Sequence, residues 1–113
     1  MKLRESHTAI LSLGEDWKGK VATEPYEAAW ASEALFFLRA LRVEEAVDGA
    51  RAAVQISPDG VHWVDEGTTL ALPRRAGELT FCRVLQFGNY LRLRAELPAG
   101  AVCRLVATLS LKA

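Results

Sequence analysis

Strict alternation of apolar and charged residues near the C-terminus constrains the fold more than any other feature. In residues 90–97, with the sequence YLRLRAEL, apolar and charged side chains take turns. A period of two is that of a β-strand with one buried face. A second alternating run over 103–111 follows Pro-Ala-Gly at 98–100. The sequence therefore predicts two consecutive strands here.

These two strands are expected to pair as a hairpin, because only a short turn separates them. A three-residue loop places the following residues opposite one another: Leu97 and Ala101, Ala95 and Cys103, Leu93 and Leu105. All of them then share one apolar face, so the register and the alternation agree.

The other face of this hairpin is a candidate interface. It would carry five side chains: Arg92, Arg94, Arg104, Val102 and Val106. Arg94 would lie opposite Arg104, and like charges across a strand pair are destabilising unless an anionic group separates them. That group is an acidic residue of the same chain, a partner subunit's carboxylate or an anionic ligand. Valine mixed with arginine is more typical of a protein interface than of a solvated face.

A second hairpin is expected over 52–66, folded at Ser57-Pro58-Asp59-Gly60. Pro58 fixes the first corner of a type I turn, the Asp59 side chain supports it by hydrogen bonding, and Gly60 takes the positive φ that follows. The register stays open. A four-residue loop places Trp63 inside, whereas a three-residue loop with a bulge places it on the face opposite Val54.

Frequent turn signals between short apolar runs predict an all-β fold. Residues 26–47 favour helix by their Ala, Leu and Glu content, yet a hairpin needs sheet neighbours, so we expect a strand over about 34–43 and keep one short helix within 26–47 as the alternative. Residues 8–13 and 17–23 add further strands. The sum is a single domain over 1–113, a two-sheet antiparallel β-sandwich of jelly-roll-like form.

Two segments carry a resemblance to known proteins. Residues 54–63 read strand, Ser-x-Asp-Gly, two residues, Trp, and residues 87–94 contain an aromatic-Leu-Arg-Leu-Arg strand. This pair resembles discoidin modules and related carbohydrate-binding jelly rolls, and similar hairpins occur in β-sandwich proteins of phage particles and in uncharacterised bacterial proteins. The resemblance covers about 52–97 and implies a sandwich fold. The chain is shorter than a typical discoidin module and lacks the terminal disulfide and secretion signal.

Candidate catalytic groups are sparse. His7 and His62 have no metal ligand or nucleophile at a suitable spacing, and neighbouring carboxylates on a strand point to opposite faces. We therefore expect no enzyme activity, no cofactor and no metal, with calcium at Asp59 or Asp65 as the alternative. Cys82 and Cys103 are expected to be buried free thiols, with a disulfide between them as the alternative if their strands are neighbours of suitable geometry.

The aromatic residues could belong either to the core or to a platform that binds a ligand. We expect Trp63, Phe36 and Phe81 to fill the core. The alternative is a carbohydrate-binding platform made by Trp17, Trp30 and Trp63.

Fourteen basic residues balance fourteen acidic ones, so no global field favours nucleic acid or an anionic membrane. No signal peptide or membrane span is recognised, which predicts a cytoplasmic protein or a component of an assembled particle. The favoured function is a non-enzymatic structural or assembly module that associates with itself or with other protein subunits, for example in a phage or another particle. A module that binds carbohydrate or another ligand is the alternative.

Overall fold

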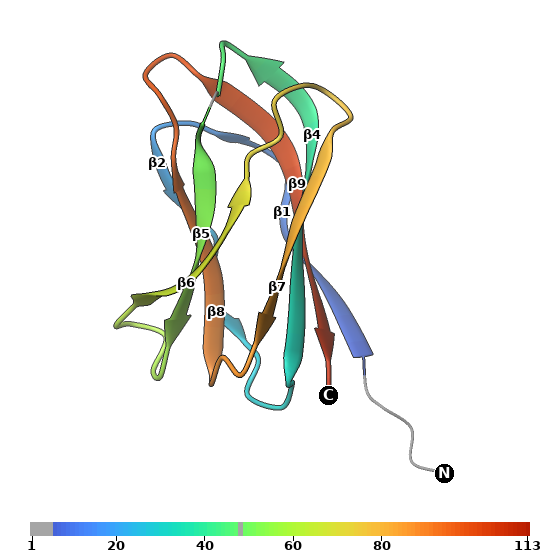
Figure 1. Cartoon of the computed structure of the whole chain (residues 1–113), viewed down its shortest axis with the longest axis vertical. Coiled ribbons are helices and arrows are strands. Elements are labelled where there is room, and N and C mark those ends of the chain that lie inside the picture. Colours follow the sequence, from blue (N-terminus) through green and yellow to red (C-terminus); the bar gives the residue numbers. More distant parts are fainter. Residues whose placement is uncertain (1–5, 48) are drawn as a thin grey trace.

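The computed structural model describes residues 6–47 and 49–113, and strands account for most of them (Figure 1). The described strands are β1 (Ser6–Trp17), β2 (Lys20–Ala22), β3 (Tyr26–Glu27), β4 (Glu33–Glu44), β5 (Arg51–Ser57), β6 (Val64–Ala71), β7 (Leu79–Leu85), β8 (Tyr90–Glu96) and β9 (Val102–Lys112). No helix occurs within the described residues. The predicted strand at 34–43 is therefore confirmed as part of β4, and the alternative helix within 26–47 is wrong.

The strands form two antiparallel sheets that face each other (Figure 1). Sheet A has the order β1-β9-β4-β7, and sheet B has the order β2-β8-β5-β6, with the short β3 added to β8. Strands near the two ends of the chain pair with each other: β1 with β9, and β2 with β8. Strands from the middle of the chain do the same: β4 with β7, and β5 with β6. This is the strand order of a jelly roll, which confirms the predicted β-sandwich.

The core lies between the two sheets and is built from the inward half of each alternating strand. In β9 the buried residues are Cys103, Leu105, Ala107, Leu109 and Leu111, and β8 contributes Leu91, Leu93 and Ala95. Phe36 and Leu38 of β4, the strand beside β9 in sheet A, are also fully buried. The buried faces predicted for 90–97 and 103–111 are thus confirmed.

The predicted pairing of β8 with β9 is wrong. β8 pairs with β2, β3 and β5 in sheet B, whereas β9 lies between β1 and β4 in sheet A. The five-residue connection at 97–101 crosses from one sheet to the other instead of closing a hairpin. Alternation reports which face of a strand is buried, and two strands that face each other across a core share the pattern of two neighbours in one sheet.

The predicted hairpin at 52–66 is confirmed as β5 and β6, but both proposed registers are wrong. Ile56 pairs with Val64, so the loop is longer than either register allowed. The turn itself has the predicted chemistry: Ser57 Oγ accepts a hydrogen bond from Gly60 N at 2.8 Å, and Asp59 Oδ1 accepts one from His62 N at 2.8 Å. Gly60 has a φ of 80°.

Candidate functional site

The outer face of sheet A exposes several large apolar side chains among its polar ones. Register places Ile10, Thr108, Phe37 and Phe81 in one row across the four strands, and Leu13, Val106, Arg39 and Leu79 in the next. Six large apolar side chains on this sheet are exposed: Ile10 59%, Leu13 71%, Leu41 42%, Leu79 57%, Phe81 57% and Leu85 55%. We call this surface the apolar face of sheet A.

β4 explains why this face forms. Its central segment, Leu35-Phe36-Phe37-Leu38, is apolar on both sides, so burying Phe36 and Leu38 in the core turns Leu35 and Phe37 outward. The Phe37 ring lies 6.2 Å from the Phe81 ring of β7, measured between centroids. Exposed apolar side chains scattered singly are normal, but a contiguous apolar patch marks an interaction site.

The charged residues of sheet A differ in how they are paired. Arg104 donates to Asp16 at 2.9 Å, and Arg42 forms an ion pair with Glu44. These two pairs lie toward one end of the face. Arg39 and Arg83, which lie among the apolar side chains, form no ion pair with any residue that the structure describes. Within residues 6–47 and 49–113, the positive charges of Arg39 and Arg83 on this face therefore have no ion-pair partner.

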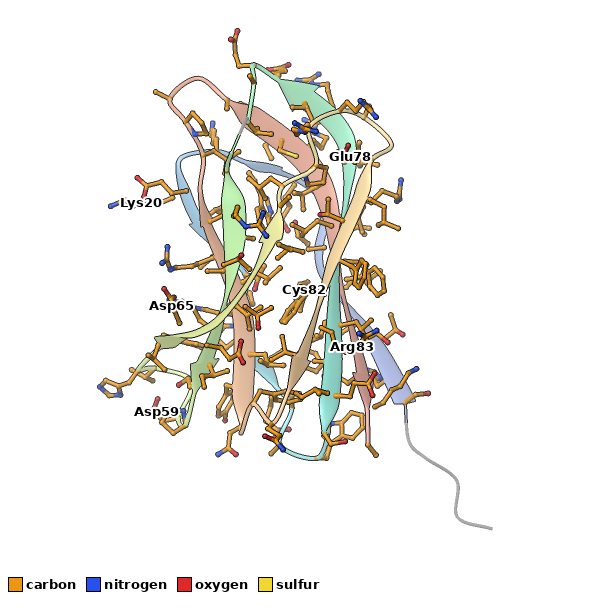
Figure 2. All side chains as sticks on the ribbon, viewed as in Figure 1. Lys20, Asp59, Asp65, Glu78, Cys82 and Arg83 are labelled. Atoms are coloured by element: carbon orange, nitrogen blue, oxygen red, sulfur yellow. The ribbon has the colours of Figure 1, made fainter. Side chains whose placement is uncertain are left out.

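The outer face of sheet B has the opposite character and carries a connected polar network. The Arg92 guanidinium lies 4.2 Å from the centre of the Trp63 ring, and its Nε donates to Gln55 Oε1 at 2.8 Å. Gln55 Nε2 donates to Asp65 Oδ1 at 2.9 Å, and Arg94 Nη2 donates to Asp65 Oδ2 at 2.9 Å. Figure 2 shows Asp65 and Lys20 on this side of the molecule.

The electrostatics of this network follow from its contacts. Hydrogen bonds from Arg94, and then from Gln55, hold the pKa of Asp65 below its usual value. The ion pair with Asp65 raises the pKa of Arg94. Burial, and then the nearby charge of Arg94, lowers the pKa of Arg92. Arg92 is thus a partly desolvated cation without a paired carboxylate in the described residues.

The five residues of the predicted interface do not share a face. Arg92 and Arg94 lie on sheet B, whereas Val102, Arg104 and Val106 lie on sheet A. The predicted juxtaposition of Arg94 and Arg104 is therefore wrong, because the two strands belong to different sheets. Each arginine is instead paired with an aspartate of its own chain, Asp65 and Asp16 respectively. Val106 does lie on the apolar face of sheet A.

The predicted aromatic platform is not assembled. Trp17 is 2% exposed and lies in the core, where its Nε1 donates to Ser12 Oγ at 3.4 Å. Trp30, 40% exposed, lines a shallow hollow with His7 and Tyr26. Trp63 is half-buried beneath Arg92. Of the aromatics expected in the core, Phe36 is confirmed, while the predictions for Trp63 and Phe81 are wrong.

The remaining candidate groups have local partners. Asp59 binds the backbone of its own turn and the His62 ring, and these hydrogen bonds lower its pKa. No group of three potential metal-ligating side chains occurs in residues 6–47 and 49–113. Cys82 and Cys103 are buried free thiols, as predicted, and burial raises the pKa of each to about 11. The position of Cys82 between the sheets can be followed in Figure 2.

Sequence reasoning missed the outward residues of β4 and β7. The sequence of β7 does contain the pattern that indicates them. Leu79, Phe81 and Leu85 alternate with Cys82 and Val84, so both sides of this strand are largely apolar.

No family model, curated protein or solved structure matches this chain. The part of the chain that the structure describes has no helix long and apolar enough to cross a membrane.

Proposed function

We propose that this chain is a non-enzymatic assembly module that associates with a second copy of itself through the apolar face of sheet A. The observation that carries the proposal is the set of six exposed large apolar side chains on one side of one sheet. Covering such a patch removes apolar area from water, which is the main driving force for association. Membership of a phage or another particle is the finer form of this proposal and is supported by the sequence resemblance.

The charges on β4 favour a second copy as the occupant. Glu33 and Arg39 point outward from the same face, six residues apart, which is about 20 Å along a strand. A two-fold axis that runs across the strands midway between them would lay each Arg39 over the other copy's Glu33. The same operation would bring Leu79 over Leu85. The face is therefore self-complementary in charge and apolar contact, as an isologous interface requires.

The size of the face also suits a dimer. Four strands spaced about 4.8 Å apart, with about 3.3 Å per residue along them, give a planar area of roughly 650 Å². A stable interface typically buries about 800 Å² on each partner. Stacking two copies of sheet A would bury an area of that order.

Sedimentation over a concentration series tests the proposal. The parent protein should be dimeric, and Phe81→Asp should shift it to monomer, because an unpaired carboxylate would then be buried in the interface. Val64→Asp is the matched control, since Val64 is 59% exposed and Phe81 57%, but Val64 lies on sheet B. A parent that is monomeric at millimolar concentration would refute self-association.

Charge reversal tests the orientation separately. Arg39→Glu or Glu33→Arg alone should weaken the dimer by placing like charges opposite each other. The double variant restores opposite charges and should recover the mass of the parent. If Phe81→Asp dissociates the dimer but the double variant is no more associated than the single ones, the face is correct and the two-fold arrangement is wrong.

A ligand-binding module is the second candidate. The platform of Trp17, Trp30 and Trp63 gives it no support, because Trp17 is in the core. Its support comes from the preorganised polar side chains of sheet B, where Trp63 already contacts Arg92.

A further inference from the structure

Arg92 is held from two directions by neighbours that leave the end of its side chain unused. Trp63 covers the guanidinium group at 4.2 Å, and Gln55 accepts the hydrogen bond from Nε. Neither terminal nitrogen donates to any residue that the structure describes. A guanidinium fixed in this way has lost most of its rotational freedom before a ligand arrives.

The network behind Arg92 has a single consistent arrangement. Arg92 can only donate and ionised Asp65 can only accept, so the Gln55 amide must turn its oxygen toward Arg92 and its nitrogen toward Asp65. Asp65 in turn receives two hydrogen bonds from Arg94, at 3.2 and 2.9 Å. The Asp65 carboxylate therefore accepts hydrogen bonds from Arg94 and Gln55 and forms no ion pair with Arg92.

Arg92 also borders a hollow on the surface of sheet B. A shallow groove between β2 and β8 is lined by Lys20, Val21, Ala22, Arg92, Arg94, Ala95 and Glu96. Lys20 adds a further positive charge at this groove. Glu96 lies along it as well but forms no ion pair with Arg92. The groove thus places the exposed Ala22 side chain beside a fixed planar cation.

We propose that this groove binds the carboxylate group of a small ligand, with the two terminal nitrogens of Arg92 donating to the two carboxylate oxygens. The planar fork of arginine matches the geometry of a carboxylate. The carboxylate belongs either to a small organic acid or to a uronic sugar residue, and Ala22 would contact the body of the ligand. This site is independent of the sheet A interface, because it lies on the opposite sheet.

Titration followed by NMR tests the site, with the indole N–H of Trp63 and the Nε–H of Arg92 as reporters. The probes are sodium glucuronate and sodium acetate, with glucose and sodium chloride as controls at constant ionic strength. Glucuronate and acetate should give saturable shifts, and glucose and chloride should not. Tighter binding of glucuronate than of acetate identifies a uronic sugar as the better ligand; equal affinity identifies the carboxylate alone.

Variants separate specific binding from general attraction to positive charge. Arg92→Lys keeps the charge but loses the fork and should weaken binding at least tenfold. Arg51→Lys is the matched control, because Arg51 also lies on sheet B and also donates through Nε, to Thr69 Oγ1 at 2.8 Å. It should bind as the parent does. Shifts that do not saturate, that chloride reproduces, or that Arg92→Lys retains would overturn the proposal. Phe81→Asp should leave the titration unchanged.

Discussion

Two phenylalanines on neighbouring strands test the assignment of the two faces of sheet A. Phe36 of β4 is 0% exposed, whereas Phe81 of β7 is 57% exposed. Burying about 200 Å² of a phenylalanine side chain contributes about 5 kcal/mol to the free energy of unfolding, at roughly 25 cal/mol per Å². We therefore expect Phe36→Ala to cost about 3–5 kcal/mol of unfolding free energy, a large part of the stability of a small domain.

Phe81→Ala should act mainly on association. In the separate subunit less than half of this side chain is covered, so its loss should cost about 1–2 kcal/mol of unfolding free energy. The exposed part, about 110 Å², would be covered in the dimer and would contribute about 3 kcal/mol per subunit. The dissociation constant should therefore rise at least a hundredfold.

The assay combines urea unfolding at a concentration where the subunits are separate with sedimentation at higher concentration. Phe36→Ala should shift the unfolding curve and Phe81→Ala should shift the mass. Equal losses of unfolding free energy in the two variants would show that Phe81 is a core residue and that the outward face of β7 is wrongly assigned.

Three further predictions concern the fold. Gly60→Val should lower the unfolding free energy by about 1 kcal/mol or more, because valine is strained at a φ of 80°, and an unchanged thermal melt would contradict this. Cys103 should react with a thiol reagent at pH 8 only after unfolding, since burial raises its pKa to about 11; rapid labelling of the native protein would contradict its burial. The pKa values of Asp59 and Asp65 are lowered in the folded state, so their contribution to stability is complete above an unfolded-state pKa of about 4 and is lost as the pH falls further. Melting temperatures measured from pH 6 to pH 2 should therefore fall below pH 4, and Asp65→Asn should flatten that fall.

Alternation in the sequence was sufficient to predict which side of several strands is buried. Leu91, Leu93 and Ala95 of β8 point into the core, as do Leu105 and Leu109 of β9. This succeeds because side-chain direction along a strand is local geometry that needs no knowledge of the partner. The turn at Ser57–Gly60 was predictable for the same reason, since its hydrogen bonds join residues within five positions of one another.

Partners could not be predicted in the same way. β8 pairs with β5 and β2, and β9 pairs with β1 and β4, so the carboxylates that meet Arg94 and Arg104 come from distant parts of the chain. Asp65 is 29 residues from Arg94, and Asp16 is 88 residues from Arg104. A jelly roll is built from such long-range pairs. A single sequence does not specify which residues pair between segments so far apart.

The apolar face of sheet A could not be predicted, because a strand that is apolar on both sides fits more than one arrangement of sheets. Leu35-Phe36-Phe37-Leu38 reads as a strand buried on both faces, which is typical of a parallel sheet covered by helices. In a two-layer sandwich only one face can enter the core, so the second apolar face must be exposed or covered by another molecule. The structure places that face on sheet A, whereas the outer face of sheet B carries the hydrogen-bonded side chains of Gln55, Asp65, Arg92 and Arg94.

This division has a consequence for how the two proposed surfaces act together. If two copies stack through sheet A, a two-fold axis lies between the apolar faces and both copies of sheet B point away from it. Each Arg92 groove then stays open to solvent on an outer surface of the dimer. A ligand that carries carboxylates at intervals, such as a chain of uronic sugars, could be held by both grooves only if it spans the thickness of two sandwiches; each sandwich has sheets about 10 Å apart. A short ligand would instead bind each groove independently, and its affinity should be the same for dimeric parent and monomeric Phe81→Asp.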